Sequence, residues 1–160
     1  MSYPDPRYFG ETGEVDCVFR RDDAPPDLTY NSGGTVDYLA TSAATGGDFG
    51  LYRWNFGPNE SGPGAHFHRT ISESFFILTG KVRLYNGQDW RTATAGDFLY
   101  VPPGGIHGFR NVAGEPASML LMFTPGAPRE GYFEGLAAGI ADLTEEERAE
   151  FYLRHDNYWV

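Results

Sequence analysis

The spacing of three histidines and one glutamate constrains the fold of this chain more than any other feature. His66 and His68 alternate within one short stretch, so on a β-strand their imidazoles project from the same face, about 6–7 Å apart. The residues between His68 and Glu73 are sufficient for a turn, which would bring the carboxylate beside the imidazoles. His107 follows about forty residues after the first pair. Only a closed or sandwiched sheet would bring it to the same place.

Three imidazoles and one carboxylate at one point form a ligand set for a metal ion. Two imidazoles and a carboxylate on one side of an ion are the set that non-haem Fe(II) sites use, and they leave coordination positions free. A fourth protein ligand still leaves room for water, O2 or a chelating substrate. The same donors accept Fe, Mn, Ni, Cu or Zn, so the pattern predicts one divalent transition metal ion without fixing its identity.

Each part of this pattern has an ordinary explanation when it is taken alone. A glutamate at the start of a strand is usually solvated, and the Pro-Gly-Gly before His107 is usually only a turn. A single histidine in an apolar stretch is more often a hydrogen-bonded core residue than a ligand. The joint occurrence of these features in order, with glycines and prolines where sharp turns are needed, favours the metal site.

With these residues in view, the chain resembles the cupin superfamily. The second stretch matches the second motif of that family at each defining position, namely Gly96, Pro102, Gly104, His107 and Asn111. The first stretch matches at His66, His68, Glu73 and Gly80. One departure is visible, because Glu60 stands where the family usually has a glycine, and Gly62 and Gly64 lie closer to the first histidine.

The resemblance implies an all-β fold, a single cupin barrel of the double-stranded β-helix or jelly-roll type with a C-terminal helical segment. It further implies that His66, His68, Glu73 and His107 bind the metal inside the barrel, and that the protein is a homodimer. The chain is similar to quercetin-dioxygenase-like cupins, which implies oxidation of a small aromatic or enolic compound by O2, with Glu73 as general base. Two alternatives stay open: a metal-dependent cyclase or isomerase of the polyketide-pathway kind, and a non-catalytic barrel that binds a small ligand.

The composition limits which binding partners and which cellular compartment we expect for this protein. A formal charge of −10 argues against nucleic acid and anionic membrane surfaces, because both would repel the chain. No stretch is long and apolar enough for a membrane span. The N-terminus lacks the basic and apolar regions of a signal peptide, and the one cysteine cannot form an internal disulfide, so we expect a cytoplasmic protein.

The chain is expected to form one domain, 1–160, in three parts: an N-terminal arm over about 1–33, a barrel core over about 34–124, and C-terminal helices over about 128–154. The arm is expected to contain one strand near Val15–Phe19. Short apolar runs separated by glycine-rich turns predict core strands at 35–41, 49–56, 66–69, 73–78, 81–85, 92–93, 98–101, 107–111 and 118–123. Helical spacing covers 128–140 and 143–154, and Thr144 and Glu147 form a capping box.

Alternation also predicts which side chains would line a substrate pocket. If the four ligands point inward, so do Phe75, Ile77 and Phe109. Such a pocket would favour a planar, apolar or phenolic substrate; equally, small barrels simply fill with aromatic residues. The helices either cover an open barrel edge or form a lid over its mouth.

Overall fold

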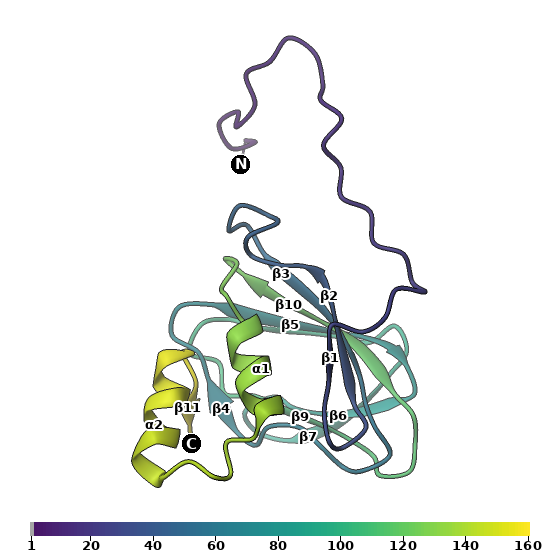
Figure 1. Ribbon diagram of the computed structural model, residues 1–160, viewed down its shortest axis with the longest axis vertical. Coiled ribbons are helices and arrows are strands. Elements are labelled where there is room, and N and C mark those ends of the chain that lie inside the picture. Colours follow the sequence, from purple (N-terminus) through teal and green to yellow (C-terminus); the bar gives the residue numbers. More distant parts are fainter. Residues whose placement is uncertain (1) are drawn as a thin grey trace.

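The computed structural model of the protein describes residues 2–160, in which short antiparallel strands are followed by two helices (Figure 1). The strands before the helices are β1 (Leu28–Thr29), β2 (Thr35–Ala40), β3 (Gly50–Asn55), β4 (His66–Phe67), β5 (Ser72–Thr79), β6 (Lys81–Tyr85), β7 (Trp90–Thr94), β8 (Phe98–Val101), β9 (Gly108–Asn111) and β10 (Ser118–Thr124). The helices are α1 (Glu130–Ala138) and α2 (Glu145–Arg154), and β11 (Tyr158–Trp159) ends the chain. An all-β barrel with C-terminal helices is thereby confirmed.

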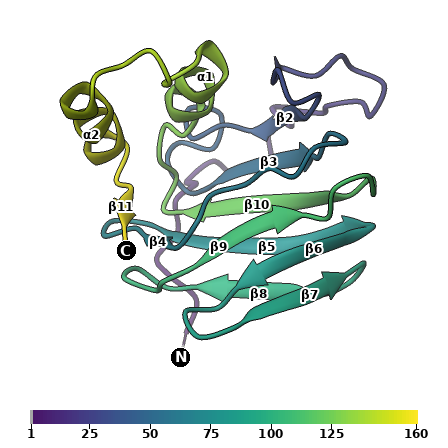
Figure 2. The same cartoon turned by 90° about the horizontal axis from the view of Figure 1, so that it is seen from below.

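The strands form two layers that face each other across the core, which Figure 1 shows apart and Figure 2 shows one in front of the other. One layer is the sheet β1-β2-β3-β10-β5-β8, and the other is built from β7-β6-β9 and the pair β11-β4. An isolated bridge joins these two smaller groups, because the backbones of His66 and His107 exchange both N–H···O bonds at 2.9 Å. Two of the four predicted ligands are therefore direct neighbours across a strand pairing.

The inward face is fixed by the pairing of β10 with its neighbours. Met119, Leu121 and Phe123 are buried and alternate with less buried residues along β10. Leu121 lies opposite both Tyr52 of β3 and Phe75 of β5. This register sets the direction of the side chains in β3 and β10.

Two glycines sit where a side chain would collide with backbone. Gly80 has φ +69 in the turn between β5 and β6, and a Cβ there would lie 2.2 Å from the carbonyl oxygen of Pro116. Gly62 has φ +135, and its Cβ would lie 2.0 Å from the carbonyl oxygen of Phe109. Only glycine fits both the backbone conformation and the space. Gly62 thus allows the segment before β4 to pack closely on β9, although the usual family glycine is replaced by Glu60.

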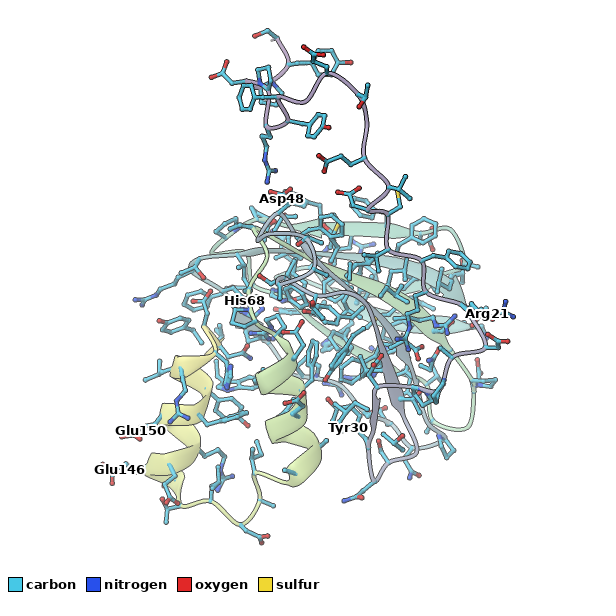
Figure 3. All side chains as sticks on the ribbon, turned by 45° about the horizontal axis from the view of Figure 1, so that its top comes forward. Arg21, Tyr30, Asp48, His68, Glu146 and Glu150 are labelled. Atoms are coloured by element: carbon cyan, nitrogen blue, oxygen red, sulfur yellow. The ribbon has the colours of Figure 1, made fainter. Side chains whose placement is uncertain are left out.

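The C-terminal segment packs on the barrel and returns to it as a strand. α2 begins with the predicted capping box, in which the Thr144 hydroxyl accepts from the Glu147 backbone N–H and the Glu147 side chain accepts from the Thr144 backbone. Glu146 and Glu150 project outward from α2 (Figure 3). After α2, β11 pairs with β4, placing Trp159 opposite His66. Neither helix within residues 2–160 is long and apolar enough to cross a membrane.

The predicted strand at Val15–Phe19 is wrong. Over residues 2–27 the arm is irregular, and the first strand is β1. Much of the arm stands away from the barrel (Figure 1), but ion pairs join Arg7, Arg20 and Asp22 to Asp48, Asp37 and Arg53 of the barrel. Val15, Val18 and Phe19 are all more than 80% exposed, so no neighbouring strand covers them. Apolar β-branched residues favour a strand only where another strand can pair with them.

Candidate metal centre

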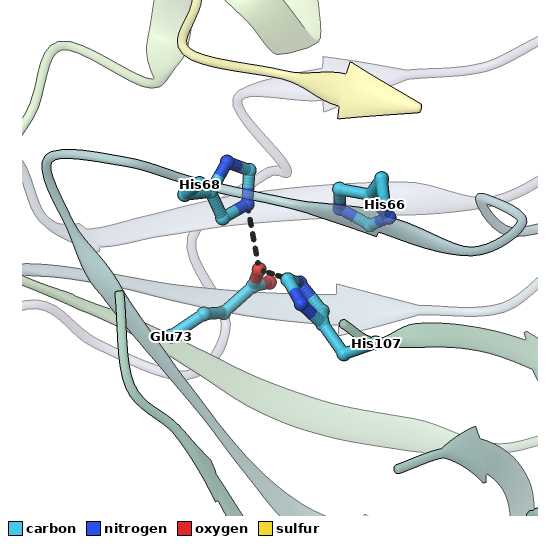
Figure 4. A group of neighbouring side chains, drawn as sticks. All are labelled: His66, His68, Glu73 and His107. Atoms are coloured by element: carbon cyan, nitrogen blue, oxygen red, sulfur yellow. Dashed lines mark hydrogen bonds and ion pairs between the residues drawn. The ribbon is translucent and has the colours of Figure 1, made fainter. Parts of the chain in front are cut away.

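Four side chains from distant parts of the chain converge inside the barrel (Figure 4). His66 comes from β4, His68 follows it directly, Glu73 comes from β5, and His107 precedes β9. One ligand atom from each residue lies within 4.8 Å of every other, and all four residues are buried. The structure therefore brings together the complete set that the sequence singled out.

Backbone carbonyl groups fix the orientation of each imidazole. Nδ1 of His66 lies 2.9 Å from the carbonyl oxygen of Gly64, and Nδ1 of His107 lies 2.9 Å from that of Gly105. Nδ1 of His68 lies 2.7 Å from the carbonyl oxygen of Asp156. A carbonyl oxygen only accepts, so each Nδ1 carries a proton. Such contacts are how proteins hold metal-binding histidines with Nε2 free for an ion.

The Nε2 atoms meet the carboxylate at the centre of the cluster. Oε2 of Glu73 lies 2.8 Å from Nε2 of His107 and 3.2 Å from Nε2 of His68 (Figure 4). A neutral imidazole that carries its proton on Nδ1 presents a lone pair at Nε2, which repels a carboxylate oxygen. The cluster therefore requires positive charge between these atoms. Without an ion, a proton on Nε2 of His107 supplies it, because Glu73 raises the pKa of this imidazole. A bound divalent cation would supply it instead, and bonds of about 2.0–2.2 Å to nitrogen and oxygen are compatible with ligand atoms this close together. The donor set and its geometry fit a transition metal ion.

The electrostatics of the centre favour an anionic carboxylate and at least one neutral imidazole. Burial, together with a smaller contribution from the neighbouring His107, lowers the pKa of His66 to about 3, so this imidazole stays neutral. Burial acts to raise the pKa of Glu73, but hydrogen bonds from His107 and His68 outweigh it and hold the pKa well below its usual range. Burial acts to lower the pKa of His107, but the hydrogen bond and the charge of Glu73 outweigh burial, so the pKa lies above its ordinary value.

Asn111, the last residue of the second motif, has a structural role. Its side chain is fully buried, and its Oδ1 accepts from the backbone N–H of Ser61 at 2.8 Å. Its Nδ2 donates to the carbonyl oxygens of Gly57 and Asn59, each at 3.1 Å. This amide therefore holds the loop that leads into the strand of His66.

A cavity of about 310 Å³ adjoins the cluster, with His66 and Glu73 in its wall. Phe109 lines it, whereas Phe75 and Ile77 are fully buried and lie outside its lining. Phe75 packs instead between the rings of His107 and Phe109, at 5.9 and 5.6 Å between centroids. The remaining aromatic residues of the wall are Tyr30, Trp54, Phe123, Tyr132, Phe133, Tyr152 and Trp159. α1 and α2 thus contribute to the cavity wall as well as covering the barrel.

Sequence reasoning missed several residues of this site, and the largest group of them lies in the C-terminal segment that begins at Arg129. Arg129 is buried and lines the cavity, although it directly precedes α1. Asp156 and Asn157 follow α2, and Trp159 packs against His66 with 5.3 Å between ring centroids. An aspartate followed by an asparagine after a helix is a weak signal for a chain reversal. Nothing in the sequence indicated that this segment returns to the strand of the histidines.

The fold and the buried cluster together define a class of protein, namely jelly-roll barrels with a cluster of metal-binding residues inside. In agreement with this class, residues 52–123 match the family model Cupin_2, described as the cupin domain. The matched segment runs from β3 to β10 and agrees with the motif resemblance to the cupin superfamily.

Three proteins show how far the similarity extends. An uncharacterised protein of Aquifex aeolicus is 32% identical over 60 residues, which are 38% of this chain and 49% of that protein. A predicted oxalate decarboxylase of Thermotoga maritima superposes with a TM-score of 0.58 at 21% identity, covering 68% of this chain and 99% of that one. The polyketide cyclase RemF of Streptomyces resistomycificus superposes with a TM-score of 0.56 at 20% identity, covering 72% and 82%. At this identity the two superpositions show the shared fold alone.

Proposed function

We propose that this protein is a metal-dependent enzyme that uses O2 to oxidise a small aromatic or enolic compound. The observation that carries the proposal is the direct contact between the four-ligand cluster and an aromatic cavity of about 310 Å³. Metal centres that only stabilise a fold are usually closed by protein ligands, whereas catalytic centres keep access to a substrate. His66 and Glu73 belong to both the cluster and the cavity wall, so a molecule in the cavity reaches the centre.

His66, His68, Glu73 and His107 would hold the ion. When bound, the ion polarises a chelating substrate oxygen and provides the one-electron chemistry that reaction with O2 requires. The protein contributes the base. Glu73 contacts imidazoles through Oε2, while its Oε1 makes no hydrogen bond within residues 2–160. Because its pKa lies well below the usual range, Glu73 is ionised. Its Oε1 could take the proton of a substrate hydroxyl whose own pKa a bound ion has lowered.

The cavity wall supports a flat substrate. Phe109 and Trp54 meet edge to face at 6.0 Å, and Phe133 packs on Trp54 at 5.6 Å between centroids. Rings packed on each other in this way give rigid apolar surfaces that orient an aromatic or enolic plane and limit the entry of water. Phe75 and Ile77 support this wall from the core rather than touching the cavity.

A second candidate function is cyclisation or isomerisation without O2. It is favoured by the shared fold with the polyketide cyclase RemF, because polarisation of an enol at the ion and proton transfer by Glu73 would serve both reactions. A barrel that binds its ligand without reaction is a third possibility. The three differ in what they consume: O2 and substrate, substrate alone, or nothing.

Oxygen consumption separates these functions. The Fe(II)-loaded protein would be supplied with a panel of flavonols, 1,3-diketones and aromatic acids in an oxygen-electrode cell and, in parallel, under strict anaerobiosis. We expect O2 uptake matched to substrate loss, and no substrate loss without O2. Anaerobic turnover would contradict the dioxygenase and support the cyclase or isomerase. His107→Gln should abolish turnover, and His155→Gln, which removes the one histidine outside the cluster, should not.

We further propose that the protein is a homodimer in a reducing cytoplasm. The arm carries apolar side chains that the rest of residues 2–160 leave more than 80% exposed, namely Tyr3, Phe9, Val15, Val18 and Phe19. The outer face of the sheet likewise exposes Phe98 and Tyr100 of its edge strand β8. Exposed apolar segments and sheet edges of this kind are usually covered by a partner. The arm of a second copy would cover them.

A further inference from the structure

Arg129 is a buried cation beside the metal centre. It stands at the N-cap position of α1, makes no side-chain cap there, and is only 4% exposed. Its guanidinium lies over the rings of Tyr132 and Phe123, at 4.3 and 5.0 Å from their centroids. The same residue lines the cavity that contains His66 and Glu73. A molecule in this cavity therefore contacts both the metal centre and the guanidinium.

The neighbours of Arg129 leave its charge without a paired anion. Nη1 donates to the carbonyl oxygen of His155 at 2.6 Å, and Nη2 donates to Oδ1 of Asn157 at 3.2 Å. Both acceptors are neutral. Nε is buried and has no hydrogen-bond partner, and the ion pairs found in residues 2–160 do not include Arg129.

An anion from outside the chain would compensate for the buried charge of Arg129. Burying a charge is costly unless a partner of opposite charge and full hydrogen bonding compensate for it. Glu73 is the one acidic side chain in the cavity wall, and it belongs to the metal centre. Once a divalent ion is bound with neutral imidazoles, the ion and Arg129 together exceed the charge of Glu73 by two. A substrate with two anionic groups would balance this excess.

We propose that Arg129 binds a carboxylate of the substrate, so that the site takes small aromatic or enolic acids rather than their neutral counterparts. One oxygen of such an acid, an enol or phenol, binds at the metal end, where Glu73 takes its proton and releases it to solvent. The carboxylate at the other end accepts from the guanidinium, which binds planar anions with a pair of parallel hydrogen bonds. This inference rests on the proposed function for the metal end of the site, and it adds the charge and the position of the second anchor.

A purely structural role for Arg129 makes a different prediction. If its hydrogen bonds to His155 and Asn157 serve only to hold the C-terminal segment, the charge of the ligand should not matter. Two probes of nearly equal shape distinguish these roles: 3,4-dihydroxybenzoate and 3,4-dihydroxybenzamide. Both have a catechol for the metal, and they differ in a carboxylate or neutral amide at the opposite end. Trp54 and Trp159 line the cavity, so quenching of tryptophan fluorescence reports binding.

The experiment measures the affinity of both probes for Zn²⁺-loaded protein, without any turnover. We expect the acid to bind at least about tenfold more tightly than the amide, as a charge-assisted pair of hydrogen bonds provides. Arg129→Gln should remove this preference and leave the affinity for the amide within about threefold, and Arg129→Lys should keep part of it. Arg154→Gln, which removes an exposed arginine from the same end of the chain, should leave the preference unchanged.

Two results would overturn the proposal: equal affinity of the wild-type protein for acid and amide, or a preference that survives in Arg129→Gln. The wild-type comparison decides the matter even if that variant does not fold, which its melting curve and metal content would reveal. Failure of the proposed function is distinguishable from both results. A protein that prefers the acid in an Arg129-dependent way but consumes no O2 with any acid would keep the anion site and lose the dioxygenase.

Discussion

Nδ1 of His68 donates to the backbone carbonyl oxygen of Asp156 at 2.7 Å, so a residue after the last helix orients a residue of the metal cluster. The side chain of Asp156 reinforces the connection. Its carboxylate accepts from the backbone N–H groups of Arg69 and Thr70 and from the Thr70 hydroxyl, at 2.7–3.1 Å. Asp156 therefore closes the turn between His68 and Glu73, and β11 then pairs with the strand of His66.

We predict that Asp156→Ala weakens metal binding about tenfold, the effect expected when a residue that orients a ligand is disturbed. The substitution also places alanine at φ +56, where a Cβ is disfavoured, and should lower the free energy of unfolding by about 1–2 kcal/mol. Asp156→Asn is the matched control, because asparagine tolerates this conformation and keeps an acceptor. Competition with a fluorescent chelator measures the affinity. Equal affinities for wild type and Asp156→Ala would show that the turn does not position the ligands.

We predict that metal affinity falls as the pH falls. Without metal, Glu73 raises the pKa of His107 above its ordinary value, so a proton on this imidazole competes with the ion already near neutral pH. His66, with its pKa lowered to about 3, and Glu73, with a lowered pKa, need lose no proton there. Below the raised pKa of His107, metal binding must displace one proton from this imidazole. The apparent affinity for the metal ion should therefore drop about tenfold for each unit by which the pH falls. A metal affinity that does not change with pH across this range would contradict the assignment of His107 as a metal ligand.

The same pKa shifts predict the pH dependence of folding without metal. Folding raises the pKa of His107, so its protonation adds to the free energy of unfolding. This contribution is fully present at a pH below the ordinary pKa and is lost as the pH rises through the raised pKa. His66 acts in the opposite direction, since its lowered pKa means that the unfolded chain takes up a proton first and stability falls as the pH drops below 6.5. A bound metal ion should remove the contribution of His107 and keep that of His66. Melting curves with and without Zn²⁺ should therefore diverge most on the alkaline side.

We predict that the arm mediates dimer formation. Replacing both Val18 and Phe19 by serine removes two exposed apolar side chains and leaves the ion pair of Asp22 with Arg53 in place. Light scattering at micromolar concentration should show a dimer for the wild type and a monomer for this variant. Thr12→Ser, a conservative change in the same arm, should remain dimeric. A wild-type monomer would refute the homodimer, and a dimeric double variant would place the interface elsewhere.

The positions of the core strands and of the metal cluster could be predicted because both depend on local patterns. Alternation put His66 and His68 on one face, and glycines such as Gly80 marked the turns. The bridge between His66 and His107 then completes the cluster through the pairing of two strands. The predicted helices were also found, with α1 and α2 each slightly shorter than their apolar patterns.

The missed parts of the site depend on contacts between residues far apart in sequence. Arg129 precedes a helix, where an arginine is ordinarily solvated, and its burial follows only from the packing of α1 against the cavity. Likewise β11 is a two-residue strand whose pairing with β4 no periodicity could reveal. The apolar residues Val15–Phe19 predict a strand, but a strand needs a partner, and the barrel offers Val15 none.

The most direct test of the metal centre is elemental analysis of protein purified without chelator and without a nickel affinity step. We predict about one transition metal ion per chain for the wild type and for His155→Gln, and almost none for His107→Gln, because the latter leaves Glu73 without its nearest imidazole. Folding of each variant would be checked by its melting curve. A wild-type protein that neither carries a metal ion nor takes one up from solution, or a His107→Gln variant that retains a full equivalent, would contradict the account.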